Sequence, residues 1–326
     1  SDFLSRGFNF YPLTEIQPGF TARLHASSAF SSRLILAMLF RLAPVVFVFL
    51  WSTGWIVAKI AATHADPLTF LVIRHALAAA AFALVAALAG AAWPSSRLAA
   101  AHVFFSGVLL HGLYLAGLWW AIGQGVPAGL SGIIAGLQPL LTGLFALALL
   151  GERLGRGQIA GLALGFSGIV IAVSPQFAGL FSTGLTGLAF PVLVNLVAML
   201  SVTLGTLYQK RFLGAGDLRT IAVWQYLGAV VVTLPLALLL EDLHFDWTYA
   251  AIGAMAWSVL GLSMGAVGLL LYLIRRGQVS RAASLIYMVP PLVAVEATLI
   301  FGEPLSLPMI VGTAIVVLGV YLVNRR

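Results

Sequence analysis

Residues 136–154 read GLQPLLTGLFALALLGERL and residues 287–305 read YMVPPLVAVEATLIFGEPL, an alignment without a gap at an offset of 151 residues. The same landmarks stand at matched positions in both stretches: a proline at Pro139 and Pro290, and a Gly-Glu pair at 151–152 and 302–303. A repeat at one fixed spacing indicates that each half of the chain contains one copy of the same structural unit.

The composition predicts that the chain lies in a lipid bilayer. Of its 326 residues, 61% are hydrophobic and 8% are charged, which is too little charge to cover a surface that faces water. The net charge of +7 would suggest nucleic-acid binding in a soluble protein, but in a membrane protein Lys and Arg mark the cytoplasmic loops. We therefore expect lipid, and no nucleic acid, around this chain. It contains no cysteine, which excludes disulfides and thiolate metal sites.

Ten apolar stretches have roughly the 20 residues that a helix needs to cross a bilayer. They are 42–62, 68–90, 101–122, 127–150 and 157–175, then 187–209, 220–240, 248–274, 281–301 and 307–323. The predicted fold class is an all-α integral membrane protein with a first five-helix repeat at 41–175 and a second at 176–326. Because five is an odd number, the second repeat must enter the membrane from the opposite side, which predicts two inverted repeats around a central cavity. Residues 1–40 form an N-terminal tail, either disordered or left over from expression, and receive no function.

The positive charges are distributed asymmetrically under this topology. Fifteen of the 17 Lys and Arg residues fall in the N-terminal tail, the even-numbered loops or the C-terminus. The other two, Lys59 and Arg74, lie inside predicted helices. The positive-inside rule therefore predicts that both termini are cytoplasmic.

Several segments resemble the EamA-type drug/metabolite transporter superfamily. They are Trp51-Ser-Thr-Gly-Trp-Ile-Val-Ala-Lys59, Asp66-Pro-Leu-Thr-Phe-Leu-Val-Ile-Arg74 and the two stretches that carry the proline and the Gly-Glu pair. Within the superfamily, the chain is most similar to the YddG-like exporters of aromatic amino acids. This resemblance covers roughly residues 41–323 and implies ten helices in two inverted repeats, a central cavity and export across the bacterial inner membrane. One departure is Pro304, which follows the second Gly-Glu pair where the first is followed by Arg153.

Prolines are expected to bend two helices at matched positions. Pro139 and the pair Pro290-Pro291 each remove a backbone hydrogen bond from a predicted helix. The freed carbonyl groups need partners inside the protein, so both bends should face the interior of the bundle. Matched bends in the two repeats favour hinges of alternating access, and a static kink is the alternative.

Polar and aromatic side chains inside the predicted helices mark a candidate substrate path, because polar groups are costly in lipid. The predicted substrate-binding residues are His111, Tyr114, Trp119, Trp51, Trp55, Gln138, Asn195, Met199 and Tyr287. Together they predict an aromatic, weakly polar cavity that suits an amphiphilic solute with a flat ring. Tryptophan also anchors helices at the membrane interface, and Asn195 and Gln138 are equally compatible with hydrogen bonds that join helices.

Three charged residues are predicted to lie toward the outer ends of their helices. Because an unpaired charge is costly there, Glu296 is expected to pair with Lys59 or with Arg74, as a lock on the fold or as an outer gate. An Arg74 side chain that reaches Asp66 or extends outward is the alternative.

The pattern favours a transporter over an enzyme. The six histidines show no paired metal-binding spacing and no serine lies in a nucleophile motif, so we expect no catalytic residues, no metal and no cofactor. The predicted function is the export of amino acids, aromatic ones (Phe, Trp, Tyr) and other neutral ones, by alternating access. The alternative is a carrier of the same fold for cationic drugs or nucleotide sugars. The sequence leaves open whether the chain is a monomer or a homodimer and whether transport is coupled to protons.

Overall fold

The computed structural model describes residues 45–150, 155–177, 187–213, 216–266, 269 and 288–324. The regular structure of these residues is helical, apart from one isolated bridge between Ala65 and Phe245. Eight of the described helices are long and apolar enough to cross a membrane, and two shorter apolar helices lie toward the C-terminus. An all-α membrane fold is therefore confirmed for the described part of the chain, whereas the predicted tail at 1–40 lies outside it.

Five of the eight long helices lie in the first half of the chain, in the order that the sequence predicts. The elements of this half are Val45–Ala62, α2 (Pro67–Leu88), α3 (Arg97–Gly107), the π-helical segment η1 (Val108–Leu113), α4 (Tyr114–Gly123), α5 (Ala128–Ala135), α6 (Leu137–Leu150), α7 (Arg156–Val173) and the short turn η2 (Ser174–Phe177). Local chemistry sets where they start. Helix α2 begins at Pro67, whose fixed φ suits a first helical turn, and the Ser96 hydroxyl caps α3 by accepting a hydrogen bond from the Ala99 N–H at 3.1 Å.

The second half continues with helices of similar length. They are α9 (Ala189–Phe212), α10 (Leu218–Leu240), α11 (Tyr249–Ala256), the π-helical segment η3 (Trp257–Ala266), α14 (Val289–Phe301) and α15 (Leu307–Asn324). Helix α14 ends at Gly302, which has a left-handed backbone with φ of 67°. Side chains with a Cβ disfavour this conformation, so the glycine of the second Gly-Glu pair terminates the helix and turns the chain toward Glu303.

Large apolar side chains cover the outside of the helices. Leu84, Val170, Leu239 and Leu299 are each 60% exposed or more, at 60%, 64%, 79% and 79%. Such a surface would be unfavourable in water but matches the hydrocarbon of a bilayer.

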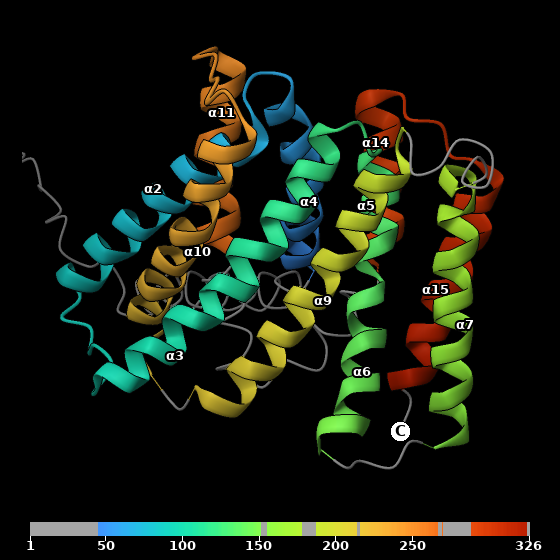
Figure 1. Ribbon diagram of the computed structural model, residues 1–326, viewed down its shortest axis with the longest axis horizontal. Coiled ribbons are helices and arrows are strands. Elements are labelled where there is room, and N and C mark those ends of the chain that lie inside the picture. Colours follow the sequence, from blue (N-terminus) through green and yellow to red (C-terminus); the bar gives the residue numbers. More distant parts are fainter. Residues whose placement is uncertain are drawn as a thin grey trace, which may run out of the picture. The chain divides into compact units, whose positions relative to one another are not determined.

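Helices α7 and α15 pack through glycines and run in opposite directions. A Cβ on Gly168 would lie 2.8 Å from the Gly312 carbonyl oxygen, and one on Gly319 would lie 2.5 Å from the Gly165 amide nitrogen. Gly168, the later of these glycines in α7, thus lies against Gly312, the earlier one in α15. Gly165 in turn lies against Gly319, so the two helices are antiparallel. Figure 1 shows the two helices side by side. Close approach of this kind requires residues without a side chain, as is common between membrane helices.

Corresponding helices of the two halves also pack against each other elsewhere. Helix α2 packs against α10, and α5 packs against α14, as α7 does against α15. The two π-helical segments correspond as well, because 108–113 shifted by 151 residues becomes 259–264, which lies inside η3. The two π-helical segments are therefore related by the same offset of 151 residues as the sequence repeats, although the sequence did not predict either segment.

Candidate functional site

A cavity of about 320 Å³ lies among helices of both halves of the chain. Five large aromatic residues contribute to its wall: Trp51, Trp55, Tyr114, Trp119 and Tyr226. The polar or charged residues of the wall are Arg74, His111, Gln138, Thr206, Gln209 and Gln225. The cavity wall is thus mainly apolar, with five large aromatic rings and a few polar groups, as ligand pockets in proteins usually are.

Six of the nine predicted substrate-binding residues line this cavity. They are Trp51, Trp55, His111, Tyr114, Trp119 and Gln138. The segment η1 presents His111, whose ring stacks on that of Tyr226 with centroids 4.8 Å apart and planes at 21°. Segments of π-helix often occur at functional sites, because the wider turn displaces side chains from their α-helical positions.

Two of the remaining predicted residues are buried and do not line the cavity. Asn195 is fully buried, and its Nδ2 donates a hydrogen bond of 2.7 Å to the Ser131 hydroxyl. The same hydroxyl accepts a 3.1 Å bond from Trp55 Nε1, so Asn195 and Ser131 fix the orientation of the Trp55 indole. Met199 is also fully buried, and neither Asn195 nor Met199 is among the lining residues of the two described pockets. The last predicted residue, Tyr287, lies outside the described residues.

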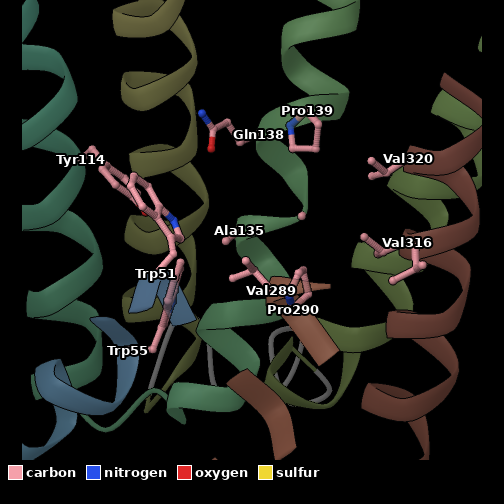
Figure 2. A pocket seen from close by; sticks show the side chains of 12 residues that line it. Trp51, Trp55, Tyr114, Ala135, Gln138, Pro139, Val289, Pro290, Val316 and Val320 are labelled. Carbon is pink, nitrogen blue, oxygen red and sulfur yellow. The ribbon is translucent and has the colours of Figure 1, made fainter. Parts of the chain in front are cut away.

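A second pocket, of about 40 Å³, adjoins the cavity, since both are lined by Trp51, Trp55, Tyr114 and Gln138. Figure 2 shows Trp51, Trp55 and Tyr114 on one side of it, Val316 and Val320 on the other, and Pro139 and Pro290 between them. Two of the three predicted hinge prolines therefore border the interior of the bundle.

The backbone is interrupted next to the first of these prolines. The predicted helix 127–150 consists of α5, which ends at Ala135, and α6, which starts at Leu137. Pro139 has no N–H to donate to the carbonyl of Ala135, and its ring would clash with that carbonyl in a continuous helix. Pro290 and Pro291 lie in the first turn of α14, where a proline is tolerated. Their role as hinges stays a prediction.

An ion pair and a helix cap meet at Glu303. Its carboxylate accepts hydrogen bonds from the backbone N–H groups of Ala128 and Gly129, at 2.9 and 3.0 Å, and forms an ion pair with Lys59. Glu303 is 7% exposed, so its charge is compensated by the first turn of α5 and by the Lys59 ammonium. The glutamate of the second Gly-Glu pair thus joins α5 to the Val45–Ala62 helix.

The predicted pairing of Glu296 with Lys59 or Arg74 is wrong. Lys59 pairs with Glu303 instead, and the Glu296 carboxylate accepts a hydrogen bond of 2.8 Å from the Ser52 hydroxyl. Glu296 and Glu303 are separated by almost two helical turns, and only Glu303 follows the left-handed Gly302 that brings it to the start of α5.

Further polar contacts join the two halves at the same end of the bundle. The Glu241 carboxylate accepts hydrogen bonds of 2.8 Å from the backbone N–H groups of Leu68 and Thr69 at the start of α2. Partial burial raises the pKa of Glu241, and these hydrogen bonds act in the opposite direction. Asp66 accepts a 2.8 Å bond from the His244 N–H. These contacts tie the start of α2 to the end of α10 and the chain that follows it.

The cavity extends toward the other end of the helices. Gln209, near the end of α9, and Leu218, the first residue of α10, both contribute to its wall. In Figure 1, α9 ends near the start of α3, away from the connection between α4 and α5. The cavity therefore reaches the α9–α10 end of the helices, whereas Lys59 and Glu303 are not among its lining residues.

Sequence reasoning missed Gln209, Gln225 and Tyr226, which line the cavity. Gln225 donates hydrogen bonds of 3.0 Å to Ser106 and Gln209, and its neighbour Tyr226 stacks on His111. Arg74 was predicted as a gate but lies on the cavity wall, with its guanidinium 5.4 Å from the centre of the Trp119 ring. A polar residue in an apolar helix, the signal that identified His111, applies equally to Gln225.

Among the described residues, no group of three or more His, Cys, Asp or Glu side chains could hold a metal ion.

The comparison with protein families decides what kind of protein contains this cavity. The sequence profile of the EamA-like transporter family matches residues 35–174 and again residues 189–325. The chain belongs to the EamA-like transporter family. It is therefore a membrane transporter and not an enzyme, with one family domain in each half.

Relatives of this EamA-like chain have names that agree with the family. It is 28% identical over 292 residues to the uncharacterized transporter YvbV of Bacillus subtilis, covering 86% of this chain and 89% of that one. It is 30% identical to a probable terminal-alkyne amino-acid exporter of Streptantibioticus cattleyicolor, covering 62% and 65%. It is 25% identical to a probable amino-acid metabolite efflux pump of Salmonella typhimurium, covering 85% and 92%. A solved crystal structure shares the fold, with a TM-score of 0.60 at 20% identity over 87% of this chain and 95% of that one.

Proposed function

We propose that this EamA-like protein exports amino acids, aromatic ones (Phe, Trp, Tyr) and other neutral ones, from the bacterial cytoplasm across the inner membrane. The observation that carries the proposal is the aromatic cavity of about 320 Å³. Two relatives named as an amino-acid exporter and an amino-acid metabolite efflux pump support the substrate class.

The size and chemistry of the cavity suit one small amphiphile. Its volume is at the lower end of the roughly 300–1,000 Å³ typical of ligand pockets. Trp51 and Tyr114 contribute rings against which an aromatic ring can pack, while His111 and Gln138 offer hydrogen bonds to its polar end. We infer that the ring of the substrate lies against the aromatic residues.

We infer a ten-helix architecture of two inverted five-helix repeats around this cavity. The antiparallel contacts of α7 with α15 support it, because Gly168 meets Gly312 and Gly165 meets Gly319, as an axis in the membrane plane requires. The matched π-helical segments η1 and η3 and the two family domains support it as well. The positions of the basic loops support cytoplasmic termini.

A difference between the two ends of the helices supports alternating access. The tied end, at Lys59 and Glu303, belongs to the loops that carry few basic residues and is therefore the outer end. The α9–α10 end, which the cavity reaches, is the cytoplasmic end. We propose that the described conformation receives substrate from the cytoplasm and that the ties around Glu303 break when it is released.

The alternative substrates fit the cavity less well. Cationic drugs need an acidic group, but the lining residues of the described cavity include no Asp or Glu. Nucleotide sugars carry phosphates, which are usually bound by several Lys or Arg side chains, and Arg74 is the one such residue among those lining the described cavity.

Counterflow in proteoliposomes tests the proposal. We expect wild-type protein to exchange labelled phenylalanine and tryptophan saturably. His111→Ala should reduce the exchange about tenfold or more, since it removes a ring from the wall, and Tyr114→Phe should reduce it less, since it removes one hydroxyl. The exchange is measured with and without a proton gradient, and a rate that does not respond to the gradient indicates facilitated diffusion. No exchange by folded protein, with exchange of a cationic dye or a nucleotide sugar instead, would contradict the amino-acid assignment.

A further inference from the structure

The Arg74 guanidinium is a buried positive charge on the wall of the cavity. Arg74 lies in the second turn of α2 and is 6% exposed. Its guanidinium carbon lies 5.4 Å from the centre of the Trp119 ring, so the aromatic ring holds the charged plane near the cavity. The side chain therefore belongs to the site itself and not to the outer surface.

None of the described carboxylates forms an ion pair with Arg74. Its one described hydrogen bond, from Nη2 to the Ser263 hydroxyl, is long at 3.5 Å. The Nε atom is buried and has no partner among the described residues. A buried charge that lacks a counter-ion is strongly unfavourable, so this guanidinium retains free donors and a demand for negative charge.

The titratable groups around Arg74 do not supply that charge. They are Tyr114, Tyr226, His75 and His111. Tyrosine is neutral at physiological pH and histidine is neutral or positive. Lys59, a partly exposed cation on the Val45–Ala62 helix, differs in this respect because the Glu303 carboxylate neutralises it.

We propose that Arg74 binds the carboxylate of the transported molecule, so that a free carboxylate is required of the substrate. The planar fork of a guanidinium matches a carboxylate with two parallel hydrogen bonds. The ring of the substrate then lies beside Trp119 and Tyr114, on the same wall. This inference rests on the proposed function and narrows it: amino acids qualify, whereas their amides, their alcohols and cationic amines do not.

Binding of two matched ligands tests this assignment apart from transport. The protein is placed in nanodiscs, and the stabilisation that each ligand gives against thermal unfolding yields its dissociation constant. The ligands are 3-phenylpropionate and 3-phenylpropionamide, which share the ring and the chain and differ in the charge of the end group. We expect wild type to prefer the carboxylate about tenfold or more, and Arg74→Gln to lose that preference. Arg74→Lys should keep part of it, because it retains the charge without the fork.

Arg219→Gln serves as the matched control. It removes an arginine that pairs with Asp217 at the start of α10 and does not line the described cavity. We expect it to leave the preference for the carboxylate unchanged. Folding of Arg74→Gln is checked by its own unfolding transition without ligand, which should not fall below that of wild type because an unpaired buried charge is removed.

The outcomes separate the inference from the proposed function. An equal affinity of wild type for acid and amide, no binding of either, or a preference that survives in Arg74→Gln would overturn the role of Arg74 even if phenylalanine is transported. Tighter binding of phenyl phosphate than of 3-phenylpropionate would also overturn the carboxylate assignment. A carboxylate preference that Arg74→Gln abolishes, in a protein that does not move phenylalanine, would support Arg74 while refuting the amino-acid substrate.

Discussion

Glu303→Ala is expected to lower the free energy of unfolding by about 3 kcal/mol or more. The substitution leaves the Lys59 ammonium without its counter-ion and two N–H groups of α5, at Ala128 and Gly129, without an acceptor. Three donors thus lose their shared acceptor, the carboxylate of Glu303, which is 7% exposed. The measurement is denaturant unfolding of the purified protein in detergent, followed by tryptophan fluorescence.

Lys59→Met is the matched control for this prediction. It removes the other half of the ion pair but leaves the Glu303 carboxylate bound to both backbone N–H groups, and the Lys59 side chain is already 33% exposed. We expect a loss of about 1 kcal/mol or less. Equal losses for the two variants would show that Glu303 acts only through the ion pair and would contradict its role as the cap of α5.

Trp119→Ala is expected to abolish most phenylalanine binding and to destabilise the protein by about 3 kcal/mol. The indole is 2% exposed and stacks on Phe70 with ring centroids 5.3 Å apart. The indole also contacts the Arg74 guanidinium. Its loss therefore leaves a void beside the cavity and removes the ring against which the Arg74 charge packs. Phenylalanine affinity should fall about tenfold or more, measured by ligand-induced thermal stabilisation, and Trp119→Phe should restore part of it.

The neighbouring residue offers a control of the same chemistry. Trp120 is not among the lining residues of the described cavity and packs edge-on against Phe190, with ring centroids 6.0 Å apart. Trp120→Ala should therefore cost stability without changing phenylalanine affinity. If both variants lowered the affinity equally, the loss would reflect general unfolding and the assignment of the aromatic wall would fail.

The elements of the fold could be predicted from sequence because each is set by local chemistry. Apolar length identified the helices, and Pro139 identified the interruption between α5 and α6. The spacing of 151 residues identified two units before any contact was known. The π-helical segments were beyond such reasoning, since 108–113 and 257–266 carry no residue pattern that separates a π-helix from an α-helix.

The site could be predicted only where one helix contains the signal. His111 and Tyr114 are three residues apart on one segment, and the structure places both on the cavity wall. The partners of Lys59 and Arg74 depend instead on which helices meet and at what depth. Glu296 and Glu303 are seven residues apart in the sequence. Glu303 reaches Lys59 because the chain turns at Gly302. Arg74 was misassigned for the same reason, because the cavity that it faces is built by both halves.

The central claim is that the aromatic cavity opens to one side of the membrane at a time, and labelling of a single cysteine tests it most directly. The natural chain contains no cysteine, so Leu115→Cys on the cavity wall is the one reactive site. Leu84→Cys, on the exposed apolar face of α2, is the unreactive control. A membrane-impermeant maleimide is added to either face of sealed vesicles.

We predict that Leu115→Cys reacts from the cytoplasmic face, that phenylalanine slows this reaction, and that adding Glu303→Gln speeds the reaction from the outer face. Equal reaction from both faces in the protein with intact Glu303, or a rate that phenylalanine does not change, would contradict the account.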